Sequence, residues 1–424
     1  MPFMLPDLIE IVPPGPRRTS TVVLPGSKSI TNRALILAAL ARDPVTLRGA
    51  LWSEDTQAMV ECLERLGFSI EVTGDPAEPA NRTLAVRGRG GTVPNAGTPG
   101  QPIELFVENA GTAARFLPPL LCLGRGSYRV SGVPRMHLRP QASLIEALRA
   151  LGYRVDTPND RLPAVVHGDG PHRGATCTVS VEESSQFASA LLLCADIGGW
   201  AVSVTGANED ELPYVDMTRR MVADFPWQGG VYDVEADASG ASYFWGADWL
   251  LRNAGSRVAV APAPASGLQA DQKFRDLIVD RPWRAAYSRR TDLADSIMTA
   301  IVLAPFAPAA TQFTDLGRLR VQECERVEAL RTELTKCGAR VDETGDTLTV
   351  HPGALHGAEI ETYNDHRVAM CFGMLALRVP GIRLRNPACV RKTFPNFFVK
   401  LAELGAGIRD AGNGRTLVGD DLLA

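Results

Sequence analysis

The chain has 424 residues, 45% hydrophobic and 22% charged, a length and balance that exclude a disordered, collagen-like or fibrous protein. The formal net charge is −4, and basic and acidic residues are mixed along the chain, so nucleic acid is not an expected partner. The apolar stretches at 34–40 and 187–195 are shorter than the roughly 18 to 20 residues of a bilayer span, and the first residues lack a signal-peptide pattern. We therefore expect a soluble, cytoplasmic protein with two domains and no membrane partner.

The eight cysteines are scattered singly, without a CxxC pair or a Cys/His cluster at metal-ligand spacing. Free cysteines inside apolar helical patterns are usually small core residues. The sequence therefore predicts neither a metal site nor a disulfide framework.

Two helical patterns alternate along the chain. Amphipathic segments that end in a glycine cap and a short strand predict surface-facing helices at 56–72, 143–155, 326–341 and 395–408, with weaker counterparts at 215–225 and 270–280. Segments that open with a small polar cluster and then stay apolar on nearly every side predict buried helices at 27–41, 109–124, 184–198, 237–251, 295–307 and 364–380.

Short valine-rich segments between these helices predict strands. The unit of sheet, buried helix, sheet and exposed helix then recurs six times, which divides naturally into three repeats per domain. Helix N-termini attract anions through free backbone N–H groups and the helix dipole. We therefore expect the six buried helices to converge on an interdomain cleft that binds a strongly negative ligand.

The first buried helix carries Lys28, Ser29 and Arg33 close to its N-terminus. Two cations at a nearly buried helix start are costly unless an anion neutralises them. The alternative is an ordinary N-cap with side chains that extend to solvent. Similar polar openings, which could also be plain caps, occur at the second and third buried helices: Asn109, Gly111 and Thr112, then Ser184, Ser185 and Gln186.

Two carboxylates are candidates for proton transfer. Asp295 begins a buried helix, a position that should depress its pKa and keep it ionised beside basic residues. Glu323 lies between Arg320 and Arg326, just before an exposed helix. The alternative for both is a structural salt bridge. Arg367 and Lys392 add to the basic set.

Nine segments resemble, in order and over nearly the full length, the 5-enolpyruvylshikimate-3-phosphate synthases of the enolpyruvyl transferase family. They are LPGSKSITNRALILAAL, NAGTAARFL, GVPRMHLRP, SSQF, LPYVDMT, DASGASYF, RVQECERV, TYNDHRVAMCF and KTFPNFF. The resemblance implies an α/β (α+β) fold of two domains, each with three βαβαββ repeats, one formed by 1–26 plus 236–424 and the other by 27–235. It also implies transfer of the enolpyruvyl group of phosphoenolpyruvate to shikimate 3-phosphate in the shikimate pathway, by a monomer without metal or organic cofactor, and a possible target for the herbicide glyphosate.

The resemblance also implies roles for individual residues. Asp295 matches the proton acceptor at the attacking hydroxyl, Glu323 is the candidate for proton exchange at C3, and Lys28 matches a lysine that touches both substrates. The shikimate 3-phosphate side would comprise Lys28, Ser29, Arg33, Ser184, Ser185, Gln186, Tyr214, Asp295, Arg318 and Gln322. The phosphoenolpyruvate side would comprise Lys28, Asn109, Gly111, Thr112, Arg139, Gln186, Arg326, Arg367 and Lys392.

Three positions depart from the pattern of that family. Gln322 stands where the pattern has a lysine, Arg318 replaces an asparagine, and Glu211 replaces a serine near the substrate phosphate. A carboxylate there would repel phosphate unless it turns away or pairs with a cation. Two alternatives therefore stay open: a sister enolpyruvyl transferase with another phosphorylated or uridylated acceptor, and a non-catalytic anion-binding protein.

Overall fold

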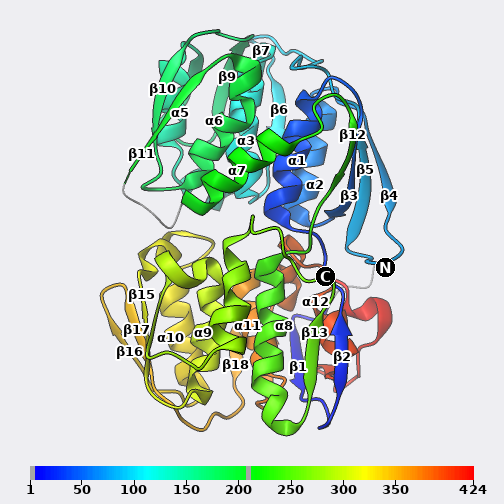
Figure 1. Cartoon of the computed structure of the whole chain (residues 1–424), viewed down its shortest axis with the longest axis vertical. Helices are drawn as coiled ribbons and strands as arrows, with labels where there is room; N and C mark the ends of the chain where they lie inside the picture. Colours follow the sequence, from blue (N-terminus) through cyan, green and yellow to red (C-terminus); the bar gives the residue numbers. More distant parts are fainter. Residues whose placement is uncertain (1–4, 207–211) are drawn as a thin grey trace. The chain divides into compact units, whose positions relative to one another are not determined.

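The computed structural model describes residues 5–206 and 212–424. The chain divides into two compact units: Met1–Pro25 with Ala236–Ala424, and Gly26–Glu235 (Figure 1). We call the first the discontinuous unit and the second the continuous unit. Among the described residues, no helix combines the length and apolarity needed to cross a bilayer.

Three helices that contact one another form the centre of the continuous unit: α1 (Lys28–Leu40), α3 (Gly111–Cys122) and α6 (Ser185–Gly198). All of α3, and α1 from Ile30 onward, is buried, as the all-round apolar patterns predict. The other helices are α2 (Glu54–Arg65), α4 (Pro134–Leu138), α5 (Ala142–Ala150) and α7 (Leu212–Asp224). The strands are β3 (Val45–Leu51), β4 (Ile70–Gly74), β5 (Asn81–Val86), β6 (Ile103–Phe106), β7 (Arg125–Ser131), β8 (Arg154–Asp156), β9 (Ala164–Asp169), β10 (Thr176–Ser180), β11 (Ala201–Thr205) and β12 (Gly230–Asp233).

The discontinuous unit has the same plan, with α8 (Ala238–Leu251), α9 (Ile297–Leu303) and α11 (His366–Leu375) in mutual contact at its centre. Its other helices are α10 (Arg326–Lys336) and α12 (Phe397–Glu403). Its strands are β1 (Leu8–Val12), β2 (Thr19–Val22), β13 (Arg257–Val260), β14 (Ala286–Ser288), β15 (Thr311–Thr314), β16 (Val341–Thr344), β17 (Thr347–Val350), β18 (Glu359–Glu361), β19 (Ile382–Arg385) and β20 (Gly407–Asp410). Short 3₁₀ or π segments are η1 (Arg252–Ala254), η2 (Ala270–Gln272), η3 (Arg275–Asp280), η4 (Arg289–Leu293), η5 (Ala294–Ser296), η6 (Ala304–Phe306), η7 (Leu316–Val321), η8 (Pro387–Lys392) and η9 (Gly419–Leu422).

The sheets carry the internal repeat. The four-stranded sheets have the orders β12-β3-β5-β4, β6-β7-β9-β8, β14-β15-β17-β16 and β18-β19-β1-β20. In each of them the first pair is parallel and the next two pairs are antiparallel. The third sheet of each unit is only a parallel pair in the part of the chain that the structure describes: β10-β11 and β13-β2. The expected six full repeats are therefore four full and two reduced ones.

The six predicted buried helices are confirmed, but three expectations about helices need correction. The fifth buried helix is short, because 3₁₀ turns η5 and η6 replace its two ends. Segment 270–280 forms η2 and η3 instead of a regular helix. Helix α12 is not surface-facing: only Glu403 in it is exposed, because β2, β20 and η9 pack against it.

The cysteines behave as core residues, with one exception. Seven of the eight free thiols are buried, and Cys324 is half-buried. Burial raises the pKa of Cys62 to about 12, although nearby Arg65 opposes the shift, so this thiol stays protonated at neutral pH.

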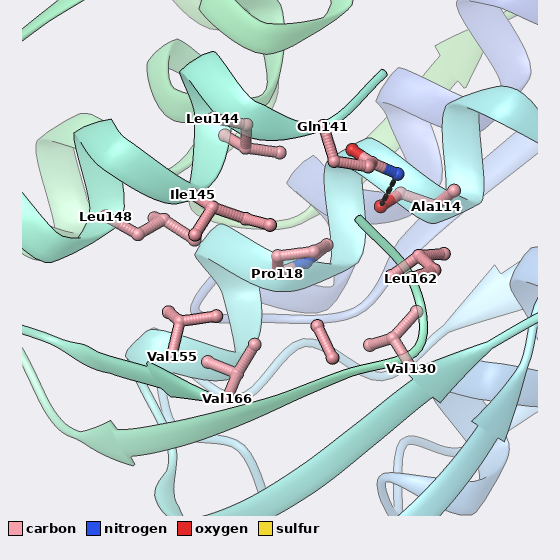
Figure 2. Close-up of a pocket in the computed structure, with 11 residues that line it drawn as sticks. Ala114, Pro118, Val130, Gln141, Leu144, Ile145, Leu148, Val155, Leu162 and Val166 are labelled. Atoms are coloured by element: carbon pink, nitrogen blue, oxygen red, sulfur yellow. Dashed lines mark hydrogen bonds between the residues drawn. The ribbon is translucent and has the colours of Figure 1, made fainter. Parts of the chain in front are cut away.

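Tight packing fixes the position of α3 within the continuous unit. An apolar cavity of about 10 Å³ lies between α3, α5 and the strands β7, β8 and β9, with Pro118, Ile145 and Val166 in its lining (Figure 2). At one side of it, Gln141 Nε2 donates to the carbonyl of Ala114 at 3.4 Å. A cavity of this size holds at most about one water molecule, so α3 packs closely against α5 and the sheet at this point.

Candidate active site

The N-terminus of α1 holds an ion pair. Lys28 Nζ lies 2.9 Å from Oδ2 of Asp55, whose side chain is only 3% exposed in the first turn of α2. The capping box formed by Ser53 and Thr56 fixes the start of α2 and so the place of Asp55. The carboxylate of Asp55 therefore supplies a protein anion for one of the two cations that the sequence places at this helix start.

Arg33 joins four helices from a buried position. Its Nε donates to Thr218 Oγ1 at 2.7 Å, its Nη2 donates to Ser189 Oγ at 3.2 Å and to the Tyr214 carbonyl at 3.4 Å, and its Nη1 donates to the Ser29 carbonyl at 3.0 Å. The guanidinium also lies 5.1 Å from the ring centroid of Phe116 in α3.

These groups around Arg33 are neutral, and burial lowers its pKa to about 10, so Arg33 still carries its charge at neutral pH. Arg33 thus remains a cation held by neutral oxygens and an aromatic face. Its guanidinium ties α1, α6 and α7 together.

The start of α3 packs against arginine side chains. Asn32 Nδ2 of α1 donates to Thr112 Oγ1 at 2.7 Å, and Arg139 Nη1 donates to the Asn109 carbonyl at 3.3 Å. A Cβ atom added to Gly111 would lie 2.8 Å from Arg139 Nη2 and 3.0 Å from Arg115 Nη1. Glycine at this position therefore lets two guanidinium groups approach the backbone of the helix start.

Ser184 caps the third buried helix, as the sequence predicts. Its hydroxyl accepts from the Gln186 backbone N–H at 3.3 Å, Ser185 is buried beside it, and Gln186 is half-buried. Tyr214 lies in α7 and is half-buried, and its carbonyl accepts from Arg33, Ser189 and Thr218. Glu211 lies outside the described residues.

In the discontinuous unit, Asp295 lies in a cluster of arginines. Its Oδ1 accepts from Arg289 Nη2 at 3.0 Å, and its Oδ2 lies 3.5 Å from Arg367 Nη2. Burial alone would raise the pKa of Asp295, but the charges of Arg367, Arg289 and Arg326 more than offset it and hold the pKa below its usual range. The arginines, rather than a helix start, are the main cause of this low pKa, because Asp295 lies in η5 and not in the first turn of α9.

Arg326, at the start of α10, contacts several polar groups. Its Nε lies 2.7 Å from Asp365 Oδ2, its Nη2 lies 2.9 Å from Glu323 Oε2, and its Nη1 donates to Gln322 Oε1. Burial opposes its charge, but Asp365 and Glu323 overcome that cost and raise the pKa of Arg326. The guanidinium therefore holds Glu323 and Gln322 in place.

A buried relay connects Asp271 to Arg367. Ser239 Oγ donates to Asp271 and accepts from Arg367 Nη2 at 3.3 Å, while Asp271 Oδ1 accepts from the Ser296 N–H at 2.9 Å. Burial raises the pKa of Asp271, although Arg367 opposes this shift. Because Ser296 follows Asp295 in the chain, these hydrogen bonds link the backbone next to Asp295 to the side chain of Arg367.

The remaining candidates lie in the two short 3₁₀ segments. Lys392 ends η8 and is buried, and Arg318 lies half-buried in η7. Arg320, which flanks Glu323 in the sequence, pairs with Glu325, Glu343 and Asp346. Within the described ranges, no group of three or more His, Cys, Asp or Glu side chains is arranged to hold a metal ion.

Among the described residues, the structure thus forms polar contacts around predicted site residues in each unit and adds residues that sequence patterns missed. Asp55, Arg289 and Asp365 are the main additions, since each forms an ion pair with a predicted site residue. The acidic first turn of α2 and the Asp in TYNDHR were available as signals for Asp55 and Asp365. Arg289 has no such signal, because it reaches Asp295 through the irregular segment η4.

Solved structures define the class of fold. The chain is similar to EPSP synthase from Acinetobacter baumannii, with a TM-score of 0.74, 21% identity, and coverage of 95% of this chain and 100% of that one. It is also similar to the enolpyruvyl transferase NikO from Streptomyces tendae, with a TM-score of 0.69, 17% identity, and coverage of 97% and 100%. The fold is therefore the mixed α/β fold of the enolpyruvyl transferases.

Sequence comparison identifies the family. The profile of EPSP synthase (3-phosphoshikimate 1-carboxyvinyltransferase) matches residues 12–401. A 3-phosphoshikimate 1-carboxyvinyltransferase from Opitutus terrae is 39% identical, covering 94% of this chain and 98% of its own length, and one from Nostoc punctiforme is 33% identical, covering 94% and 99%. The chain belongs to the EPSP synthase family.

Proposed function

We propose that the protein transfers the enolpyruvyl group of phosphoenolpyruvate to the 5-hydroxyl of shikimate 3-phosphate and releases phosphate. The observation that carries this proposal is the placement of Asp295 and Glu323 against Arg367 and Arg326. An anion-binding protein would gain nothing from carboxylates beside the cations that attract its ligand, whereas an acid–base enzyme needs both.

The basic residues would bind the reacting anions. Phosphoenolpyruvate carries about three negative charges, which charge-assisted hydrogen bonds from several cations can offset. The residues proposed to bind it are Lys28, Asn109, Gly111, Thr112, Arg139, Gln186, Arg326, Arg367 and Lys392. Those proposed for shikimate 3-phosphate are Lys28, Ser29, Arg33, Ser184, Ser185, Gln186, Tyr214, Asp295, Arg318 and Gln322.

The proposed reaction is an addition followed by an elimination. The 5-hydroxyl oxygen bonds to C2 of phosphoenolpyruvate, its proton passes to Asp295, and C3 gains a proton from Glu323. The bond between C2 and the phosphate oxygen then breaks, the leaving phosphate takes the proton from Asp295, and C3 returns a proton to Glu323 as the double bond re-forms. Atoms and charge balance without a redox partner.

Substrate binding would change the pKa of Asp295, the proposed proton acceptor. Arg367 holds the pKa of Asp295 down in the free protein, which makes Asp295 a weak base there. When phosphoenolpyruvate engages the same guanidinium, its attraction for Asp295 falls and the carboxylate becomes more basic. Binding of phosphoenolpyruvate would therefore raise the pKa of the proposed proton acceptor, while Arg289 continues to hold its carboxylate.

The two groups of residues belong to different units of the chain, so the proposal requires both units to act on one pair of substrates. We propose domains at 1–26 plus 236–424 and at 27–235. The enzyme would work as a monomer in the cytoplasm, without metal or organic cofactor.

The identity of residue 322 matters for the choice of acceptor substrate. The amide oxygen of Gln322 accepts from Arg326, so it does not supply the positive charge that a lysine would bring. We propose that Arg318, in the same segment, supplies this charge and that shikimate 3-phosphate remains the acceptor. A sister reaction with a uridylated acceptor is the alternative.

The test is phosphate release from phosphoenolpyruvate with shikimate 3-phosphate, with UDP-N-acetylglucosamine, and without acceptor. Release that depends on shikimate 3-phosphate is the expected result. Release only with the uridylated sugar would favour the sister reaction, and no release with either acceptor would favour a binding protein.

A further inference from the structure

Two adjacent residues before α11 have a left-handed backbone. Tyr363 has φ of +54° and Asn364 has φ of +53°. Asparagine tolerates this region, but a bulky residue such as tyrosine rarely adopts it. Such conformations persist only where surrounding contacts impose them, and they gather at functional sites.

A buried carboxylate holds the side-chain hydroxyl of Tyr363, whose side chain is otherwise partly exposed. Glu333 in α10 is fully buried, and its Oε1 accepts from the Tyr363 hydroxyl at 2.7 Å. Its other contacts are Lys336 Nζ, at 2.8 Å from Oε1, and the Glu361 backbone N–H, at 3.2 Å from Oε2. Glu333 therefore ties the segment that enters α11 to the helix that begins with Arg326.

Further hydrogen bonds hold the same turn. The Asp365 N–H donates to the Thr362 carbonyl at 2.8 Å, and Asn386 Nδ2 donates to Asn364 Oδ1 at 3.1 Å. Thr362 Oγ1 in turn donates to the Arg385 carbonyl at 2.8 Å. The turn is thus fixed on both sides of the left-handed pair.

Asp365, which follows the left-handed pair, accepts hydrogen bonds from two arginines. Asp365 Oδ1 accepts from the Arg367 backbone N–H at 2.8 Å and so caps α11, while Oδ2 accepts from Arg326 Nε at 2.7 Å. A change in the turn at 363–364 would therefore move both Arg367 and Arg326.

We propose that Tyr363 and Glu333 are positioning residues that set Arg326 and Arg367 for phosphoenolpyruvate. The inference rests on the proposed function for the ligand of these arginines. The strained turn supplies one rigid geometry for two cations that come from different helices.

Two substitutions of Tyr363 distinguish a role in positioning the arginines from a role in the stability of the fold. Tyr363→Phe keeps the strained backbone and loses the hydrogen bond to Glu333. Tyr363→Gly loses the same bond but removes the steric cost of the left-handed backbone. The matched control is Tyr153→Phe in the continuous unit, where the hydroxyl donates to the Gly170 carbonyl at 2.7 Å.

The measurements are the melting temperature, hydrogen exchange of the backbone amides at 366–370, and the KM for phosphoenolpyruvate separately from kcat. Both Tyr363 variants should raise that KM about five-fold or more, as expected for the loss of an interaction at a charged site, with a smaller change in kcat. Both should speed amide exchange at the start of α11, and Tyr153→Phe should do neither. Tyr363→Gly should melt closer to the wild type than Tyr363→Phe.

Two outcomes overturn the inference. One is a KM for phosphoenolpyruvate that recovers in Tyr363→Gly together with the melting temperature, since the tyrosine would then serve stability alone. The other is unchanged amide exchange in both variants. Because exchange is read in the protein without substrate, it tests the positioning even if the wild type shows no enolpyruvyl transfer, a result that would count against the proposed function instead.

Discussion

Asp365 and Arg326 form a two-point ion pair in which both side chains are buried, with Arg326 Nε 2.7 Å from Oδ2 and Nη2 3.2 Å from Oδ1. The same guanidinium also holds Glu323. The guanidinium of Arg326 therefore sets the positions of the buried carboxylate of Asp365 and of the proposed catalytic carboxylate of Glu323.

Arg326→Lys should remove this fork geometry while keeping the charge. A lysine ammonium cannot contact Asp365 at two points and Glu323 at the same time. We expect kcat/KM for phosphoenolpyruvate to fall by about two orders of magnitude, since roughly 3 kcal/mol is typical for a lost charge-assisted contact. The control is Arg331→Lys in the same helix, whose ion pair with Glu343 is half-exposed. An equal loss in both variants would contradict the special place of Arg326.

Glu323→Gln should abolish proton exchange at C3 and keep the shape of the side chain. We expect turnover to fall by about 100-fold or more, the typical contribution of general acid–base catalysis, with KM values changed little. Steady-state kinetics with both substrates provides the measurement. Glu343→Gln also removes a carboxylate that pairs with arginines, here Arg331 and Arg320, and should leave turnover near that of the wild type. Near-normal turnover in Glu323→Gln would remove this residue from the mechanism.

Gly111→Ala should weaken phosphoenolpyruvate binding without loss of stability. The added Cβ atom would lie 2.8 Å from Arg139 Nη2, so this flexible side chain must shift. We expect the KM for phosphoenolpyruvate to rise by about ten-fold, equivalent to about 1.4 kcal/mol, with the melting temperature unchanged. Gly74→Ala adds the same methyl where no atom lies within 4 Å and should change neither quantity. A lower melting temperature with a normal KM would show that Gly111 serves packing alone.

Asp295 should make stability depend on pH in the acid range. Its pKa is lower in the folded protein than in the unfolded chain, so its ion pairs stabilise the fold above the unfolded value of about 4. This stabilisation is lost as the pH falls towards the folded value. The melting temperature of the wild type should therefore exceed that of Asp295→Asn at pH 7, and the difference should shrink below about pH 4.

The exposed ion pair of Asp276 with Arg281 gives the comparison for this pH effect, because surface pairs contribute little. Asp276→Asn should melt close to the wild type at every pH. A gap between the wild type and Asp295→Asn that stays constant from pH 7 to pH 3 would contradict the account of Asp295.

The variant Arg318→Asn tests whether Arg318 supplies the positive charge that Gln322 lacks. If Arg318 supplies the missing charge, its loss should raise the KM for shikimate 3-phosphate about five- to thirty-fold, as expected for one charge-assisted hydrogen bond. Arg18→Asn, at an exposed arginine of the same unit, should have little effect. An unchanged KM in Arg318→Asn would point to a different acceptor.

The central helices could be predicted from sequence because their composition alone sets them apart. A helix that is apolar on every side, such as α3 with Phe116 and Leu117, must be buried whatever surrounds it. Helix α12 shows the opposite case. Its polar positions suggested a solvent face, yet Lys400 is buried under neighbouring segments that no local pattern reveals.

The candidate site could likewise be predicted only in part from the sequence. The basic residues at the helix starts stand out as charges in apolar surroundings, and Lys28 and Arg33 were predicted in this way. The acidic first turn of α2 was a signal for Asp55, but its pairing with Lys28, and that of Thr218 with Arg33, could not be predicted, since these residues meet only in the fold. The left-handed pair at Tyr363 was also beyond prediction, because neither residue is a glycine.

The most direct test of the enzyme assignment is a single NMR experiment with the purified protein, phosphoenolpyruvate and shikimate 3-phosphate, in which ³¹P and ¹H spectra follow both substrates. The account predicts that the phosphoenolpyruvate phosphorus signal is replaced by that of inorganic phosphate while the 3-phosphate signal of the acceptor persists. New vinyl proton signals of an enolpyruvyl ether should appear at the same rate. Unchanged spectra of both substrates, or phosphate release without a vinyl ether, would contradict it.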